Sequence, residues 1–131
     1  MGDLNDDPQN KSCSKVLNAR KRMEDGMATA DLFNPFWDKL DHGIGTLAYK
    51  GGWNLFDQII MNGHFTQYCQ GKDKPQLTFV RAEVLNRDFL RTSDGDRQGY
   101  PLRTFSAGVF LNGYSDHFPT EIFLVKEAPN Y

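Results

Sequence analysis

Apolar residues concentrate in two runs in the second half of the chain, and both runs predict strands. Residues 77–85 and 119–126 are rich in branched and aromatic side chains, as strands usually are. Polar residues with Gly and Asp fill 92–99, which predicts a loop, and a polar stretch with Gly and Pro at 71–75 predicts a turn. The second half is therefore predicted to be mostly strand and loop.

A β-hairpin is predicted around a pair of glycines. Gly51 and Gly52 separate residues 46–50 from residues 53–62, and glycine permits the positive φ angles of a tight two-residue turn. The second strand contains Asp57 directly before a hydrophobic run. Because a charge at the edge of a buried strand is costly unless it is paired, we expect Asp57 to have a partner.

The first third of the chain predicts helical structure. Residues 10–22 suggest a helix, with Ser12 as a candidate N-cap and with Val16, Leu17 and Met23 on one face. The basic residues near its end are expected to form a solvated face rather than a phosphate-binding surface. Residues 27–40 predict one or two short helical turns with these side chains packing inward: Leu32, Phe33, Phe36, Trp37 and Leu40.

Composition narrows the functional classes. The 131 residues are 39% hydrophobic, as expected for one globular unit, and 17 acidic against 15 basic residues give a net charge of -2. This balance disfavours a small nucleic-acid-binding module, because no strong positive field is present. No apolar run reaches the ~20 residues of a membrane span, and no signal peptide is recognised. Cys13 and Cys69 lack zinc-site spacing and are expected to be free thiols or core fillers rather than a structural bridge, so the compartment is undecided.

The stretch GYSDHFP, residues 113–119, places an acid and an imidazole side by side. Asp116 and His117 lie between a Gly-containing turn and Pro119, at the mouth of the last predicted strand. Loops at strand ends often carry catalytic side chains, because the sheet holds them rigidly. The alternative is a plain turn, which Ser, Asp and Pro also favour.

A second candidate motif lies at the start of the chain. In GDLNDDP, residues 2–8, Asp3 and Asn5 are two positions apart, so in an extended segment they point to the same side. A carboxylate and a carboxamide placed in this way can act on one substrate. The alternative is a polar turn with an Asx cap.

Together, GDLNDDP and GYSDHFP resemble the endonuclease/exonuclease/phosphatase family. This family of metal-dependent phosphoesterases includes pancreatic deoxyribonuclease, abasic-site endonucleases, sphingomyelinases and inositol phosphatases. The resemblance implies an α/β fold, the C-terminal half of a four-layer α/β sandwich, with a mostly antiparallel sheet and a flanking helix. Because only Met1 precedes the GDLN motif, residues 1–131 are expected to form the C-terminal part of a single domain, without the N-terminal half that supplies an Asn and a metal-binding Glu.

The resemblance also implies roles for five residues. Asp3 would activate or position the attacking water, and Asn5 would donate to a phosphate oxygen. His117 would bind the scissile phosphate or transfer a proton, with its ring oriented by Asp57. Asp116 and Asp3 would bind the metal. An oxygen-rich ligand set favours Mg2+ or Mn2+ over zinc.

The expected substrate is a phosphate ester of a nucleic acid, a phospholipid head group or a small molecule. Arg97 and Arg103 precede the SDH turn and suit phosphate binding, although a surface or packing role is expected. This portion is expected to be inactive without the missing half. The alternative function is a noncatalytic scaffold remnant that acts through self-association or partner binding. The most useful observation for the catalytic hypothesis is whether the five residues converge in one pocket. The hypothesis itself requires that the acid and amide of the first motif face the imidazole of His117.

Overall fold

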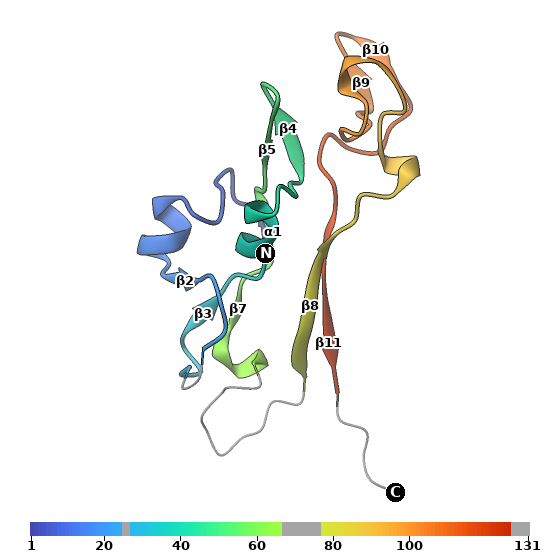
Figure 1. Ribbon diagram of the computed structural model, residues 1–131. Helices are drawn as coiled ribbons and strands as arrows, with labels where there is room; N and C mark the ends of the chain where they lie inside the picture. The colour runs from blue at the N-terminus through green and yellow to red at the C-terminus, as the bar shows by residue number, and fades with distance from the viewer. Residues whose placement is uncertain (25–26, 67–76, 127–131) are drawn as a thin grey trace, which may run out of the picture.

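The computed structural model describes residues 1–24, 27–66 and 77–126. These residues form short strands, few helices and several small sheets (Figure 1). The strands are β1 Gly2–Asp3, β2 Ala19–Arg20, β3 Leu32–Phe33, β4 Leu47–Tyr49, β5 Gly52–Asn54, β6 Asp57–Gln58, β7 Met61–Asn62, β8 Thr78–Val84, β9 Phe105–Ser106, β10 Val109–Phe110 and β11 Thr120–Val125. The helices are the π-helix η1 Ser12–Val16, the α-helix α1 Phe36–Asp41 and the 3-10 turns η2 Gly63–Phe65, η3 Asp88–Leu90 and η4 Gly95–Arg97.

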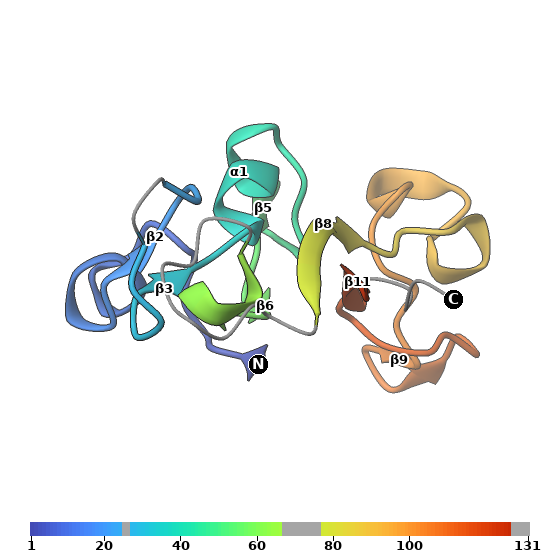
Figure 2. The ribbon, with the colours of Figure 1, turned by 90° about the horizontal axis from the view of Figure 1, so that it is seen from below.

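A long antiparallel ribbon of β8 and β11 runs beside the other sheets (Figures 1 and 2). This ribbon confirms the two strands predicted at 77–85 and 119–126. The other antiparallel pairs are β1 with β6, β4 with β5, β9 with β10 and β3 with β7, while β2 lies parallel to β3. This mostly antiparallel arrangement is consistent with the predicted α/β class. The four-layer sandwich and the assignment to its C-terminal half stay predictions.

Two buried clusters form the core and meet at the β8–β11 ribbon. One contains Met27, Phe33 and Met61, and the other contains Phe36, Leu55 and Ala82. Phe79 of β8 and Ile122 of β11 pack against both clusters, so the ribbon connects them. Burial of these side chains is the main favourable term in folding. The inward packing predicted for Phe33 and Phe36 is confirmed.

The helix predicted over residues 10–22 is wrong beyond its first turns. Only η1 is helical, and Asn18 takes a φ of 54°, which no helix interior permits. Ala19 is then buried in β2, so pairing with β3 replaces further helical turns. Val16 and Leu17 are 78% and 44% exposed, which contradicts the predicted apolar face. Ser12 does not cap the helix, because its hydroxyl donates to Asp6.

The predicted hairpin is confirmed, with a one-residue correction in the turn. Tyr49 pairs with Gly52, so the turn residues are Lys50 and Gly51, with φ angles of 49° and 80°. Positive φ at both positions is the geometry of a type I′ turn. The long second strand predicted to residue 62 is divided into β5, β6 and β7.

Further predictions concern the segment at 27–40, the two cysteines and membrane spans. Leu32 and Phe33 form a strand instead of a helical turn, because they pair with β2 and β7. Cys13 is a buried free thiol, as expected, while Cys69 and the turn predicted at 71–75 lie outside the described residues. In the described part of the chain, no helix has the length and apolar character needed to cross a membrane.

Candidate functional site

Pairing of β1 with β6 brings the first motif to Asp57. Asp3 is the register partner of Asp57, and the N–H of Leu4 donates to the carbonyl of Phe56 at 2.9 Å. The two carboxylates therefore start from neighbouring positions on adjacent strands. Two carboxylates in neighbouring positions repel each other unless a cation or a proton lies between them.

A buried polar network fixes the segment that carries Asp3. The carboxylate of Asp7 is 8% exposed and accepts from the N–H of Leu55 at 2.6 Å and from the side-chain amide of Asn54 at 2.7 Å. The amide of Gln58, itself 1% exposed, donates to the carbonyl of Asp6 at 2.6 Å. These bonds tie the chain after Asp3 to the β5–β6 region, so the position of Asp3 is determined by buried contacts.

The loop that carries His117 is held on both sides. Phe118, which directly follows His117, is 2% exposed, and its N–H donates to the carbonyl of Thr46 at 2.7 Å. At the other side of the loop, a Cβ on Gly113 would lie 1.9 Å from the carbonyl oxygen of Leu102, so only glycine fits there. The hydroxyl of Thr104 also donates to the carbonyl of Gly113 at 2.9 Å.

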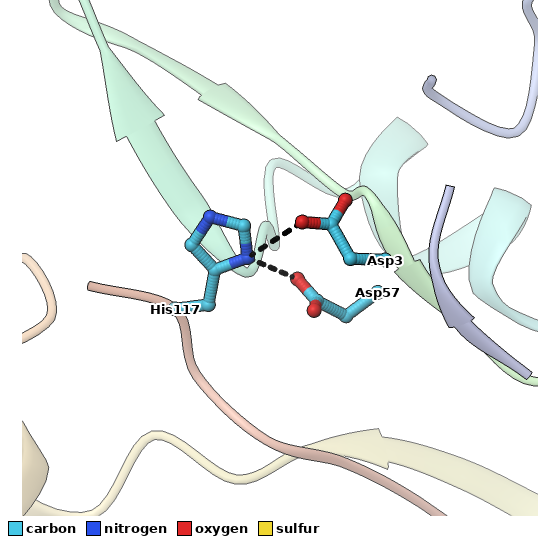
Figure 3. A group of neighbouring side chains, drawn as sticks. All are labelled: Asp3, Asp57 and His117. Carbon is cyan, nitrogen blue, oxygen red and sulfur yellow. Dashed lines mark hydrogen bonds and ion pairs between the residues drawn. The ribbon is translucent and has the colours of Figure 1, made fainter. Parts of the chain in front are cut away.

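Three side chains from the two ends and the middle of the chain meet at one point (Figure 3). Nδ1 of His117 lies 2.8 Å from Oδ2 of Asp57 and 4.0 Å from Oδ2 of Asp3. The ring is oriented with Nδ1 towards both carboxylates and Nε2 away from them (Figure 3). The expectation that Asp57 has a partner is therefore confirmed, and that partner is His117.

Exposure differs among these three side chains. Asp57 and His117 are 22% and 21% exposed, while Asp3 is 43% exposed. One oxygen of Asp3 accepts from the N–H of Asn5 at 2.9 Å, so the other oxygen faces His117. The group thus combines a shielded Asp57–His117 pair with a carboxylate that solvent and ligands can reach.

Asn5 departs from the predicted geometry. It has a φ of 52°, so the segment from Asp3 is not extended at Asn5 and the expectation of a same-side pair from strand spacing is wrong there. Asparagine tolerates this left-handed conformation better than most residues. The bond from its N–H to Asp3 forms an Asx turn, the alternative given for this motif.

Asp116 is not part of the group formed by Asp3, Asp57 and His117 within the described residues. Its exposed side chain lines a cavity of about 490 Å³. Arg97 and Arg103 line that same cavity. The five predicted residues therefore do not all share one cluster, and metal binding by Asp116 stays a prediction.

Three further side chains that could have served the site make contacts elsewhere in the fold. His42 is exposed, and its Nδ1 lies 2.7 Å from the carbonyl oxygen of Asp38. Trp53 is half-buried and stacks on Phe118 with 6.0 Å between ring centroids. Sequence reasoning missed Asp7, although the DDP run after the first motif could have indicated an acceptor for backbone N–H groups.

Hydrogen bonds lower the pKa of the Asp6 carboxyl in the first motif. The hydroxyl of Ser12 and then the side-chain amide of Asn10 donate to Asp6 and lower the pKa of its carboxyl from 3.8. Donors favour the charged carboxylate over the neutral acid. Asp6 is thus held charged beside the segment that carries Asp3.

Comparison with known proteins gives one match. The model of the Endonuclease/Exonuclease/phosphatase family matches residues 1–126, which include Asp3, Asp57 and His117. No curated protein and no solved structure matches the chain. The family match covers nearly all 131 residues and contains both motifs that met in the folded chain. The chain belongs to the endonuclease/exonuclease/phosphatase family.

Proposed function

We propose that the chain carries the catalytic centre of a divalent-metal-dependent phosphoesterase. Membership in the family supports a metal-dependent hydrolase of phosphate esters. The observation that carries the proposal is the 2.8 Å contact between Nδ1 of His117 and Oδ2 of Asp57, with Asp3 beside them. A carboxylate that holds one ring nitrogen leaves the other nitrogen to act on a substrate.

His117 would act on the phosphoryl group through Nε2. With Nδ1 donating to Asp57, the ring has a fixed orientation and tautomer, and Nε2 is directed away from the carboxylates (Figure 3). As an imidazolium, His117 would donate to a phosphoryl oxygen and stabilise the charge of the transition state. As a proton donor, it would protonate the leaving oxygen, and Asp57 would stabilise the ring before the transfer.

Asp3 would act on the attacking water. Its carboxylate is 43% exposed and is steered by the N–H of Asn5, so an oxygen can accept a proton from a water molecule in line with the leaving group. Asn5 would then donate to a phosphate oxygen through its exposed carboxamide. Both roles follow from the family resemblance, and the Asp3 contacts support them.

The donor set fits a hard divalent cation at Asp3. Mg2+ and Mn2+ prefer oxygen ligands, and Mg2+ usually binds through one or two carboxylates while it keeps several waters. Asp3 offers such a half-exposed carboxylate, whereas Nδ1 of His117 is already bonded to Asp57. When bound, the cation supplies charge to neutralise the phosphoryl oxygens. We also propose Asp116 as a metal-binding residue, with a Glu and an Asn from another half of the domain completing the site.

Complementation tests this function. The chain is mixed with a separately expressed first half of a family domain, and hydrolysis of bis(p-nitrophenyl) phosphate and p-nitrophenyl phosphate is followed with and without Mg2+. Hydrolysis that requires Mg2+ and both polypeptides is expected. Absence of Mg2+-dependent hydrolysis of every phosphodiester and phosphomonoester tried would contradict the proposal.

A noncatalytic role in partner binding or self-association is the second candidate. The observation that favours it is two pairs of exposed aromatic side chains, Phe105 with Phe110 at 5.3 Å and Phe89 with Tyr114 at 5.9 Å between ring centroids. Exposed apolar patches often mark interaction sites. Size-exclusion chromatography with light scattering separates the two functions, because a scaffold for self-association forms a defined oligomer without metal.

A further inference from the structure

A cavity of about 490 Å³ lies between the β4–β5 hairpin and the loop that contains η4. Its size suits a ligand such as a nucleotide. The hairpin contributes residues 48–51, the loop contributes residues 96, 97, 100, 101 and 103, and Asp116 forms the remaining lining. Because Asp116 immediately precedes His117, the cavity adjoins the loop that carries the imidazole.

A row of aromatic rings connects the cavity wall to that loop. Tyr100 in the wall meets Trp53 edge to face, with 5.3 Å between ring centroids, and Trp53 stacks on Phe118 at 6.0 Å. Phe118 is 2% exposed and directly follows His117. The contacts that hold the imidazole therefore also hold the cavity wall, so a group bound in the cavity has a fixed relation to the site.

Three cations line the cavity, and within the described part of the protein none of them pairs with a carboxylate. Lys50, Arg97 and Arg103 are exposed and form no ion pair there with a carboxylate within 4.0 Å, although Asp96 and Asp116 line the same space. The polar contact of Arg97 is a 3.4 Å bond to the neutral hydroxyl of Ser106. Arginine binds phosphate oxygens with two parallel donors, so this lining suits a phosphate group.

The backbone conformation of Lys50 is also relevant to phosphate binding in the cavity. Its φ of 49° lies in the left-handed region, where Asn and Gly are preferred in type I′ turns. Its Nζ lies 5.2 Å from the ring centroid of Tyr49, which also lines the cavity. A lysine in a turn position that favours other residues thus contributes an ammonium group to the lining of the cavity.

We propose that this cavity binds a second anionic group of the substrate, separate from the phosphate that faces His117. This inference rests on the proposed phosphoesterase function and names its substrate class: phosphate esters that carry an additional phosphate next to the scissile one. Arg97 and Arg103 bind the additional phosphate, and Lys50 approaches it from the hairpin. Tyr49 and Tyr100 line the cavity with rings that a base or another flat group can contact.

Binding without metal tests the proposal directly. The affinities of thymidine 5′-monophosphate and thymidine 3′,5′-bisphosphate for the full chain are measured by calorimetry in EDTA. We expect the bisphosphate to bind at least about tenfold more tightly, as a charge-assisted contact to a second phosphate provides. In the double variant Arg97→Ala/Arg103→Ala this preference is lost, while the monophosphate affinity changes little.

Arg87→Ala is the matched control, because Arg87 is an exposed arginine that lines a different cavity. It should keep the full preference, and a circular dichroism melt of each variant checks that the fold is intact. Pyrophosphate is measured in parallel: equal loss of its affinity in the double variant indicates a site that reads phosphate alone, whereas loss confined to the bisphosphate indicates one that also contacts the nucleoside. Both results support the anionic subsite.

Equal affinities of the two thymidine nucleotides, or a preference that persists in the folded double variant, would overturn the subsite. The outcome is independent of catalysis. If hydrolysis with the complementing half depends on Mg2+ and the binding preference is absent, the proposed function stands and the subsite fails. If the preference is present and hydrolysis is never found, the anion site stands and the proposed function fails.

Discussion

Nδ1 of His117 and Oδ2 of Asp57 lie 2.8 Å apart, although 60 positions separate the two residues in the chain. Two independent anchors produce this contact: β1–β6 pairing sets Asp57 beside Asp3, and the buried Phe118 sets the loop of His117. The pair is about one-fifth exposed, so solvent screens it only in part. An oriented imidazole is therefore built into the fold before any substrate binds.

Asp57→Asn should reduce kcat by about 10²- to 10⁴-fold in the complemented enzyme, because an amide neither stabilises the imidazolium nor fixes the same tautomer. The 15N chemical shifts of His117 should report a change of tautomer in the same variant. Asp41→Asn is the control, since Asp41 pairs with Lys21 at the surface. Equal effects of the two substitutions on kcat would contradict the orienting role of Asp57.

Asp7→Ala should lower the free energy of unfolding by about 2 to 4 kcal/mol, because it leaves the buried N–H of Leu55 and the amide of Asn54 without their acceptor. Asp7→Asn keeps an acceptor oxygen and should lose less. Urea denaturation measures both values. A loss below about 0.5 kcal/mol in Asp7→Ala, the range of ordinary surface substitutions, would show that this carboxylate does not hold the first motif.

Asp6 gives the protein a defined response to acid. Because its folded-state pKa is lowered from 3.8, chiefly by Ser12, its contribution to stability is fully present above that value. The contribution is lost as the pH falls through the lowered pKa of the folded state. The stability difference between the wild type and Asp6→Asn, measured by denaturation from pH 7 downwards, should be constant at neutral pH and shrink below pH 3.8. A difference that grows on acidification would contradict this sign.

Lys50→Asn should separate stability from ligand binding. Asparagine accepts the φ of 49° more readily than lysine, so thermal unfolding should show a gain of up to about 1 kcal/mol. The same variant should bind thymidine 3′,5′-bisphosphate more weakly, because an ammonium group is removed from the cavity. Lys50→Arg keeps the charge and should keep the affinity. Unchanged affinity in Lys50→Asn would remove Lys50 from the subsite.

The sequence indicated strands best where apolar composition was strong and local. The β8 and β11 segments carry such patterns and were predicted, and the β4–β5 hairpin was predicted from its pair of glycines. The helix at 10–22 failed because the left-handed Asn18 and the burial of Ala19 in β2 depend on contacts with β3. Such contacts lie outside any local window, so tertiary pairing overrode helical periodicity.

The candidate site was also predicted only in part. Asp3, Asp57 and His117 were named from motifs, and the folded chain brings them together. Asp116 was expected beside them, but it neighbours His117 in sequence, and adjacent residues of a non-helical segment tend to point in different directions. Lys50 was not singled out, since only the register of the hairpin places it in the turn at the cavity.

Hydrolysis of bis(p-nitrophenyl) phosphate as a function of Mg2+ concentration, by the chain supplied with a complementing first half, tests the central claim most directly. The wild type should show saturable dependence on Mg2+, and His117→Ala should lower kcat/KM by at least about 10²-fold, as expected for loss of a group that transfers a proton or stabilises the phosphoryl charge. Hydrolysis that proceeds equally well in His117→Ala, or that never depends on a divalent cation, would contradict the account.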